Sequence, residues 1–301
     1  MIMNVLVTGS NGFIGTHVCR YLKEKGMYVI GMGRRAEATS KVDEYVCCDM
    51  SSDDIFEIPN KVSVKIDAVI HLAADMRKEP YGVEIVVHNC SGMQRLLEMC
   101  EANGIERLAE LSSLPVIGKP IQHPITEEHP LCPPTVYHTT KVAQEMLADY
   151  AHRHHGLKTI SFRISAPVGE GMNEKTIFPT FVRACLENKP IVLSGKGSRK
   201  QTYVHAKDIA QALYLAICSD ATGVYNLGSY NLISNYDLAC KCKEILKSDS
   251  EITFSGTEDK MDDYVWDVSI DKICKDLGYK PVISIEDAIL DYAEVINGGE
   301  K

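Results

Sequence analysis

The 301-residue sequence has fewer basic than acidic side chains and no long apolar run. Lysine and arginine total 32 against 41 aspartates and glutamates, which gives a formal net charge of −9. This balance argues against general affinity for nucleic acid or for an anionic membrane surface. No stretch of about 18 apolar residues is present, and no basic segment precedes an apolar core at the N-terminus, so we expect neither a membrane span nor a signal peptide. The sequence therefore predicts a cytoplasmic protein without a nucleic-acid or membrane partner.

The sequence also lacks a C-x-x-C pair, although it contains 11 cysteines. Cys47 and Cys48 are adjacent and the others are more scattered, so their spacing does not indicate a zinc site or a dithiol redox centre. His152 and His155 are spaced for one face of a helix, but a metal site needs further ligands and the sequence places none beside them. We expect no metal, and a set of reduced, mostly buried thiols.

Strand-like and helix-like segments alternate through the first half of the chain. Short apolar, β-branched runs predict strands at 3–8, 27–32, 44–48, 67–72, 107–112 and 157–165. Apolar residues at helical spacing predict helices at 13–26, 85–104 and 136–156. Strand, helix and strand in repeated succession predict an α/β protein with a doubly wound, mostly parallel sheet and helices on both faces.

The pattern loosens after Pro167. The further expected elements are helices at 174–188, 205–219, 234–247 and 284–297 and short strands near 223–227 and 251–254. We expect a first domain of residues 1–166 with a return segment at about 201–230, and a smaller α+β lobe of residues 167–200 and 231–301.

The stretch NVLVTGSNGFIG, residues 4–15, places three glycines directly after the first predicted strand. Gly9 suits a tight turn, Gly12 lets the backbone approach a pyrophosphate closely, and Gly15 lets the following helix pack on the strand. The N-terminus of that helix adds N–H donors and the positive end of its dipole. A plain tight turn is the alternative, but a glycine turn inside a βαβ unit is typical of dinucleotide binding. The residues expected to contact the dinucleotide here are Gly9, Asn11, Gly12, Phe13, Ile14 and Gly15.

Five motifs in register carry a resemblance to a known family. VTGSNGFIG is followed by HLAA at 71–74, SSLPVIG at 112–118, YHTTK at 137–141 and YVHAKDIA at 203–210. In this order they resemble the extended short-chain dehydrogenase/reductase family, the NAD(P)-dependent epimerases and dehydratases of nucleotide sugars. The resemblance implies a Rossmann-like fold, a C-terminal substrate-binding lobe, a nucleotide-sugar substrate and a homodimer formed through the helices of Asn89 and Tyr137.

Tyr137 and Lys141 are the candidate catalytic pair. They are four residues apart on a predicted helix, so their side chains project from the same face. A phenol has a pKa of about 10, and lowering it by about 3 units needs roughly 4 kcal/mol of preferential phenolate stabilisation, which we expect from Lys141 and a cationic nicotinamide. The resemblance implies that Tyr137 exchanges a proton with the substrate hydroxyl and that Ser113 hydrogen-bonds the reacting oxygen. It also gives Asn89 a supporting role, with a buried structural amide as the alternative.

The end of the second predicted strand bears on the choice of cofactor. The resemblance implies an acidic residue there in NAD-binding members, and this sequence has Gly33 followed by Arg34 and Arg35. A guanidinium suits the 2′-phosphate, so we favour NADP(H) over NAD(H), with two solvated loop arginines as the alternative. Asp49 resembles the family's adenine-contacting aspartate, and a helix cap is its alternative role. The further residues expected to bind the cofactor are Met50, Leu72, Ala73, Ala74, Asn89, Tyr137, Lys141 and Pro167.

The residues after Ser113 bear on the type of reaction. Family dehydratases have an Asp-Glu pair where this sequence has Leu114 and Pro115, and members that invert further ring carbons need a cysteine near Leu114. The resemblance therefore disfavours dehydration and favours a UDP-hexose 4-epimerase-like enzyme that works through a 4-keto intermediate. An NADPH-dependent 4-ketosugar or carbonyl reductase is the alternative, which Arg34 favours. A non-catalytic NADP(H)-binding sensor on the same fold is a second alternative.

The substrate side departs from the family pattern. Ala166 stands where an asparagine often contacts the substrate, Gln201 stands where an arginine commonly holds a diphosphate, and residues 258–263 contain no arginine. Other cations are the candidates to compensate, since lysine also binds phosphate, and a substrate that is not a nucleoside diphosphate sugar is the alternative. The candidate substrate-contacting residues are Ser113, Ala166, Arg199, Gln201 and Lys260.

Overall fold

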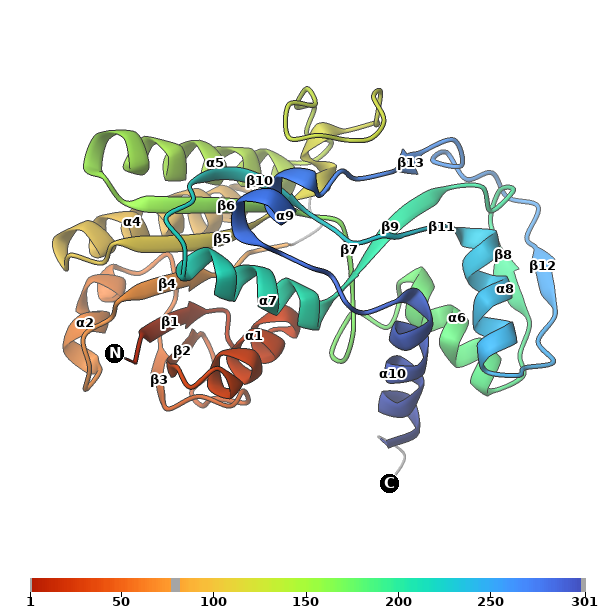
Figure 1. Ribbon diagram of the computed structural model, residues 1–301, viewed down its shortest axis with the longest axis horizontal. Coiled ribbons are helices and arrows are strands. Elements are labelled where there is room, and N and C mark those ends of the chain that lie inside the picture. Colours follow the sequence, from red (N-terminus) through yellow and green to blue (C-terminus); the bar gives the residue numbers. More distant parts are fainter. Residues whose placement is uncertain (1, 77–81, 299–301) are drawn as a thin grey trace.

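A seven-stranded parallel sheet forms the larger part of the molecule (Figure 1). The computed structural model describes residues 2–76 and 82–298. The strand order is β10-β6-β5-β4-β1-β2-β3 and every neighbouring pair is parallel. The strands are β1 (Asn4–Thr8), β2 (Tyr28–Gly33), β3 (Glu44–Cys47), β4 (Ala68–His71), β5 (Arg107–Ser113), β6 (Lys158–Ile164) and β10 (Gly223–Leu227). The predicted α/β fold is confirmed.

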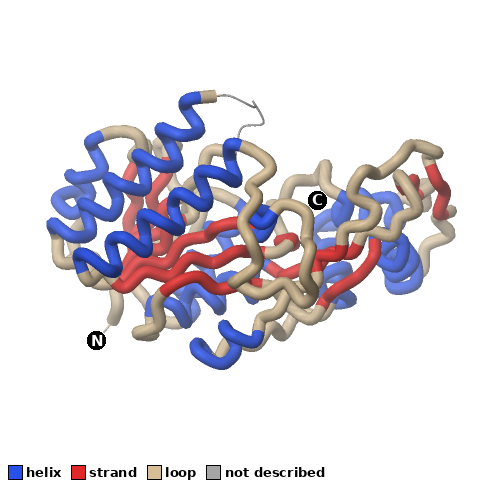
Figure 2. Tube along the Cα trace, turned by 90° about the horizontal axis from the view of Figure 1, so that it is seen from above, coloured by secondary structure: helices blue, strands red, loops and turns tan. Residues whose placement is uncertain are grey.

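Helices cover both faces of this sheet, as Figures 1 and 2 show. On one face lie α1 (Phe13–Glu24) and α7 (Ala206–Ile217), and on the other α4 (Gly92–Ala102) and α5 (Val136–His155). Side chains of a strand alternate between the faces, so Val5 and Val7 pack with α1 and α7 while Leu6 packs with α4 and α5. Both faces are therefore apolar, as the near-continuous hydrophobic strands require.

The predicted helix 85–104 is a chain of three pieces. It begins as α3 (Val83–Val86), widens into one π-helical turn, η2 (Val87–Ser91), and continues as α4. A π turn inserts one extra residue into the helix and so rotates the side chains that follow it. The remaining short elements of this half are η1 (Asp53–Glu57), α2 (Ile58–Lys61) and η3 (Leu114–Ile117).

The rest of the chain builds a smaller second lobe with its own core (Figure 1). The helices predicted there are present as α6 (Ile177–Leu186), α8 (Asn235–Ile245) and α10 (Ile285–Gly298), and the strand predicted at 251–254 as β12 (Ile252–Phe254). Asp208 of α7 accepts hydrogen bonds from the N–H groups of Val282 and Ile283, at 3.1 and 3.2 Å, and so holds the segment that leads into α10.

Several elements in the second half of the chain were not predicted from the sequence, and the last of them packs against the core of the large sheet. They are β7 (Ala166–Val168), β8 (Ile191–Leu193), β9 (Lys200–His205), β11 (Asn231–Ser234), β13 (Val265–Trp266) and α9 (Asp271–Leu277). The strands are short and pair with distant segments: β9 pairs with β7, β11 and β13, and β8 pairs with β12. Such strands carry too little local pattern to be read from sequence. Among the described residues, no helix has the length and apolar character needed to cross a membrane.

Candidate active site

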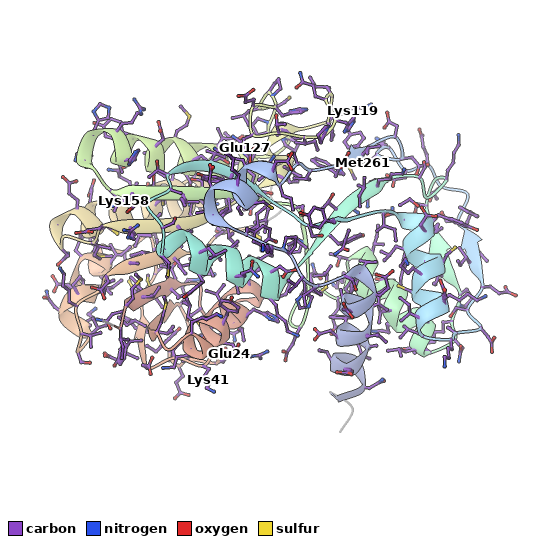
Figure 3. All side chains as sticks on the ribbon, in the orientation of Figure 1. Glu24, Lys41, Lys119, Glu127, Lys158 and Met261 are labelled. Carbon is purple, nitrogen blue, oxygen red and sulfur yellow. The ribbon has the colours of Figure 1, made fainter. Side chains whose placement is uncertain are left out.

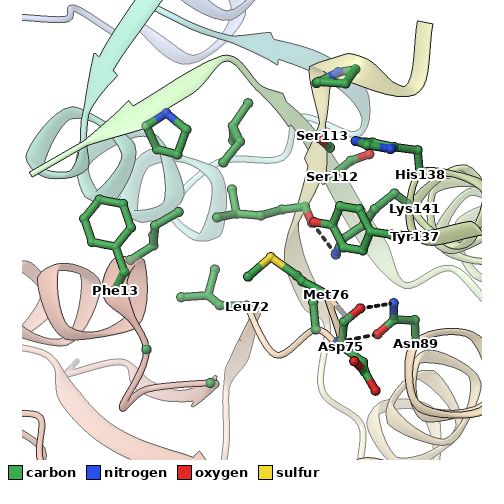
Figure 4. A pocket seen from close by; sticks show the side chains of 18 of the residues that line it. Phe13, Leu72, Asp75, Met76, Asn89, Ser112, Ser113, Tyr137, His138 and Lys141 are labelled. Atoms are coloured by element: carbon green, nitrogen blue, oxygen red, sulfur yellow. Dashed lines mark hydrogen bonds between the residues drawn. The ribbon is translucent and has the colours of Figure 1, made fainter. Parts of the chain in front are cut away.

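A cavity of about 950 Å³ lies between the large sheet and the second lobe, at the carboxyl ends of the parallel strands. This edge is where open α/β sheets bind their ligands. The cavity begins at the glycine turn after β1, passes the ends of β2, β4 and β5, and reaches β9 and β13 of the second lobe. Figure 4 shows its central part, with Tyr137, Lys141 and Ser113 gathered on one side and Phe13 on the other. One continuous space thus joins the predicted cofactor and substrate residues.

The glycine turn is packed so closely that larger side chains would clash. A Cβ on Gly9 would lie 2.8 Å from the Ala73 nitrogen, and Gly9 has a φ of +69°. A Cβ on Gly15 would lie 2.2 Å from the Gly9 oxygen. The N-terminus of α1 at Gly12 borders the cavity, so the N–H groups of its first turn are available to an anion. This cradle fits the pyrophosphate of a dinucleotide.

Asn11 also borders the cavity but is engaged elsewhere. Its Nδ2 donates to the Glu37 carbonyl at 2.9 Å, and its Oδ1 accepts from the Thr39 N–H at 2.8 Å. Asn11 therefore orders the loop after β2, and its predicted contact with a cofactor stays a prediction.

The loop after β2 places two exposed arginines on the cavity, Arg34 and Arg35. Asp49 lies across from them, and its carboxylate accepts two hydrogen bonds from Ser51, at 2.8 and 2.7 Å. Burial raises the pKa of Asp49, but the Ser51 hydrogen bonds and the positive charges of His88 and Arg34 outweigh it, so the pKa is lowered. The cap of the following helical turn is Ser52, not Asp49.

Tyr137 and Lys141 lie on the first turns of α5 and both border the cavity. Lys141 is buried, and its Nζ donates to the Leu111 carbonyl at 2.7 Å. Burial lowers the pKa of Lys141, while Glu110 and Glu145 act in the opposite direction. Burial raises the pKa of Tyr137 to about 12. The phenol thus needs added positive charge before it can act as a base, which a cationic nicotinamide nearby would supply.

The side chain of Asn89 forms three hydrogen bonds. Its Oδ1 accepts from the Asp75 N–H at 2.7 Å, and its Nδ2 donates to the Asp75 carbonyl at 3.0 Å and to Thr140 Oγ1 at 2.9 Å (Figure 4). These bonds tie the loop after β4 to α5. The arrangement is that of a buried structural amide at the border of the cavity.

On the substrate side the structure brings together most of the predicted residues, with one exception. Ala166, Arg199 and Gln201 border the cavity. Lys260 is exposed and is not among the residues that line the cavity, so its contact with substrate stays a prediction. Its exposure follows from the turn that carries it: Asp259, the residue before it, faces Arg199 at 3.9 Å, and the lysine is left on the outside.

Sequence reasoning missed several residues that line the cavity. They are Lys119, His138, Met261, Tyr264 and Trp266. Lys119 and Met261 lie near each other where the lobes meet (Figure 3), and Lys119 pairs with Asp263 at 2.5 Å. Tyr264 and Trp266 are two residues apart with ring centroids 6.2 Å apart. Alternation in an aromatic strand was the available signal for this pair.

Comparison with known proteins identifies the family and supports the fold. The sequence model of the NAD dependent epimerase/dehydratase family matches residues 5–228. A dTDP-glucose 4,6-dehydratase from Streptomyces niveus is 24% identical over 97% of this chain and 92% of its own length. A UDP-glucose 4-epimerase from Halalkalibacterium halodurans is 28% identical over 81% of this chain and 80% of its own. The crystal structure of a UDP-glucose 4-epimerase from Thermotoga maritima with UDP-glucose superimposes with a TM-score of 0.88 at 24% identity, and covers 99% of this chain and 100% of that one.

Proposed function

Since the chain belongs to the NAD dependent epimerase/dehydratase family, we propose that it is a NAD(P)-dependent sugar-nucleotide epimerase that inverts carbon 4 of a UDP-hexose through a 4-keto intermediate. The observation that carries this proposal is the single cavity that joins the glycine cradle to Tyr137, Lys141 and Ser113. Together with a nicotinamide cofactor held at the glycine turn, these groups would be able to oxidise and reduce one carbon.

In the proposed reaction Tyr137 accepts the proton of the C4 hydroxyl as the C4 hydrogen leaves as hydride. Ser113, at the end of β5, donates a hydrogen bond to the same oxygen, and Lys141 supplies positive charge beside the phenol. A bound nicotinamide cofactor supplies the acceptor and donor of the hydride. After the 4-keto sugar has rotated in the cavity, the hydride would return to the opposite face of C4 while Tyr137 returns the proton to the oxygen, so that the inverted hydroxyl forms. The sum is redox-neutral.

The residues beside Ser113 support epimerisation over dehydration. Leu114 is buried and Pro115 lines the cavity, and neither side chain carries an acid or a base. Elimination of water across C5 and C6 needs both, so a chain with these two residues has no group there to move the second proton.

We propose that the second lobe holds the nucleotide sugar. Residues 167–200 and 231–301 form this substrate lobe, and residues 1–166 with the return segment 201–230 hold the cofactor. Arg199 supports the assignment: its side chain is mostly buried at the cavity, its Nε has no hydrogen-bond partner within the described chain, and its nearest carboxylate, Asp259, is 3.9 Å away. A guanidinium held this loosely is suited to a diphosphate.

The position of Arg34 and Arg35 supports NADP(H) as the preferred cofactor. Both are exposed at the end of the cavity where β2 ends, and a 2′-phosphate there would meet two guanidinium groups. The same arginines favour the second candidate function, a reductase that uses NADPH as an exchangeable reagent.

The experiment that tests the proposal follows cofactor and product together. The purified protein is titrated with NADPH and NADH, using the fluorescence of Trp266, the sole tryptophan, which lines the cavity. UDP-glucose and related UDP-sugars are then supplied while absorbance at 340 nm is recorded. Interconversion of sugars without net cofactor change supports the epimerase. Net NADPH consumption with a keto compound would contradict the epimerase proposal and support the reductase. Tight cofactor binding without turnover of any compound would contradict both and support a sensor.

We further propose a homodimer that works in the cytoplasm. Exposed apolar side chains on α3, η2 and α5 support the dimer: they are Val83, Val86, Val87, Met146 and Tyr150. All 11 cysteines are free thiols, which supports a reducing compartment, although only five of them are fully buried.

A further inference from the structure

Strand β5 carries a glutamate at a place where a charge is costly. Glu110 has no exposed surface and lies in the middle of a central strand of the sheet. Its Oε1 accepts a hydrogen bond from Ser161 Oγ of β6 at 2.6 Å. Its Oε2 is buried and has no hydrogen-bond partner within the described chain. A buried carboxyl group of this kind either takes up a proton or needs a nearby positive charge to compensate the desolvation of its ionised form.

A layer of polar side chains surrounds Glu110 between the sheet and α5. From α5 come Lys141, Gln144 and Glu145, from β6 Ser161 and Arg163, from β4 His71, and from β5 itself Ser112. Each of these residues is buried. Lys141 connects this polar layer to the site, because it is buried in the layer and also lines the cavity beside Tyr137.

Within this layer Lys141 is the cation available to compensate the charge of Glu110. Arg163 already forms an ion pair with Glu145, in which Nη2 donates to Oε2 at 2.7 Å and Nε donates to Oε1 at 3.0 Å. Burial lowers the pKa of His71 to about 3, so its ring is neutral. Lys141 donates only to the Leu111 carbonyl among the described residues and keeps two N–H groups for other contacts.

Glu110 and Lys141 influence each other's protonation. Burial raises the pKa of Glu110 to about 7, and Lys141 is the first of the neighbours that oppose this rise. Glu110 is likewise the first of the charges that oppose the lowering of the Lys141 pKa. Above about pH 7, where Glu110 is ionised, the two groups therefore carry compensating charges in this layer.

We propose that Glu110 is a positioning residue of this enzyme, whose carboxylate, buried in the same polar layer, keeps Lys141 protonated beside Tyr137. The inference rests on the proposed function for its effect on turnover. It predicts that the protonation of Lys141 on α5 depends on the carboxylate of Glu110 on β5. Glu110 does not line the cavity and so lies out of reach of the substrate. Glu110 then acts through Lys141 and makes no contact with the reacting atoms.

The test is the pH dependence of Glu110→Gln, which has the shape of the protonated carboxylic acid. At about pH 6, where wild-type Glu110 is mostly protonated, we expect kcat of the two proteins to agree within about twofold. At about pH 9 we expect Glu110→Gln to be slower by about tenfold, since Lys141 then loses its proton at lower pH. KM and cofactor affinity are expected to stay within about twofold. The matched control is Glu106→Gln, an exposed glutamate just before the same strand.

A second variant guards against misfolding. Ser161→Ala removes the one hydroxyl that donates to Glu110 and leaves both charged residues in place. The pH at which Glu110 ionises should rise, so the activity lost at neutral pH should return at higher pH. Loss of kcat by the same factor at every pH, in either variant, would overturn the proposal and leave Glu110 a purely structural residue.

A readout without substrate separates this inference from the proposed function. The folded-state pKa of Glu110 lies above its unfolded value, so wild-type stability should fall as pH rises from about 4.5 to about 7, and Glu110→Gln should lack this loss. A difference in melting temperature that is constant across this window would overturn the inference. The expected pH-dependent difference, found in a protein that turns over no nucleotide sugar, would instead refute the proposed function and support the ionisation of Glu110.

Discussion

At the scale of single residues, Tyr137 offers the clearest prediction. Burial raises its pKa to about 12, so its phenol is a proton donor at rest and a base only beside added positive charge. We expect Tyr137→Phe to lower kcat by about 10²- to 10⁴-fold, because the group that moves the proton is removed. Cofactor affinity should change by less than about threefold, as measured by fluorescence titration.

The matched control is Tyr236→Phe, a half-exposed tyrosine on α8, away from the cavity lining. Its kcat should equal that of the wild-type protein. A Tyr137→Phe variant with a tenth or more of wild-type kcat would remove Tyr137 from the proposed reaction.

Arg34 and Arg35 decide the second residue-scale prediction. If both guanidinium groups face the 2′-phosphate, Arg34→Ala with Arg35→Ala should weaken NADPH binding by about tenfold or more and leave NADH binding within about twofold. Parallel titrations of the two cofactors measure the ratio. Lys41→Ala, an exposed cation from the same stretch of chain, controls for general charge. An unchanged NADPH-to-NADH ratio would show that the two arginines are only solvated.

Residues in family motifs could be assigned from sequence, while residues brought in by distant pairing could not. Gly9, Tyr137 and Lys141 lie in short segments whose local structure alone positions them. Trp266 reaches the cavity only because β13 pairs with β9, some 65 residues earlier in the chain, with Trp266 beside Gln201. Glu110 gave a clear signal, an acidic residue inside an apolar strand, but its partners on α5 and β6 become visible only in the folded chain.

At the scale of elements, the ion pair between Arg163 and Glu145 joins β6 to α5. Both side chains are at least nine-tenths buried, and Arg163 Nη1 also donates to the Glu127 carbonyl at 3.0 Å. Removing one partner of such a pair leaves the other charge unpaired, which typically costs about 3–5 kcal/mol. We expect Arg163→Met to lower the free energy of unfolding by this amount, as measured by urea titration.

Arg153→Met is the control for this loss. Arg153 pairs with Asp149 on the exposed side of α5, at 2.7 Å, and such a helical pair contributes about 0.3–0.5 kcal/mol. Equal effects of the two substitutions would contradict the assignment of the buried pair as the link between β6 and α5.

The elements themselves divide in the same way. Strands of the large sheet could be predicted because burial on both faces produces continuous apolar runs. Long helices such as α5 could be predicted because burial along one stripe produces apolar residues at helical spacing. Strands β7, β9, β11 and β13 could not, because two to six residues hold no period and their pairing depends on where the two lobes meet. The cavity lies between the two lobes, so the residues at its substrate end were the hardest to predict from the sequence.

At the scale of the whole molecule, the exposed apolar side chains on α3 and α5 bear on the oligomeric state. Val83 and Met146 are each 68% exposed, and Val86 and Tyr150 lie on the same two neighbouring segments, α3 and α5. Side chains of this kind, gathered on adjacent helices that also carry Tyr137, are typical of an interface between copies of the chain. We expect the wild-type protein to be a dimer in solution, measured by light scattering after gel filtration.

Val86→Asp with Met146→Asp should convert this dimer to a monomer, because each copy would bring two charges in place of apolar side chains that the interface would bury. Leu290→Asp, at a 47% exposed leucine of α10 in the other lobe, should leave the mass unchanged. The monomer should still bind cofactor, since the glycine turn, Arg34 and Lys141 border the cavity from the same chain. If dimer packing holds the start of α5 in place, kcat should fall while cofactor affinity stays. A dimer that survives both aspartates would place the interface on another face.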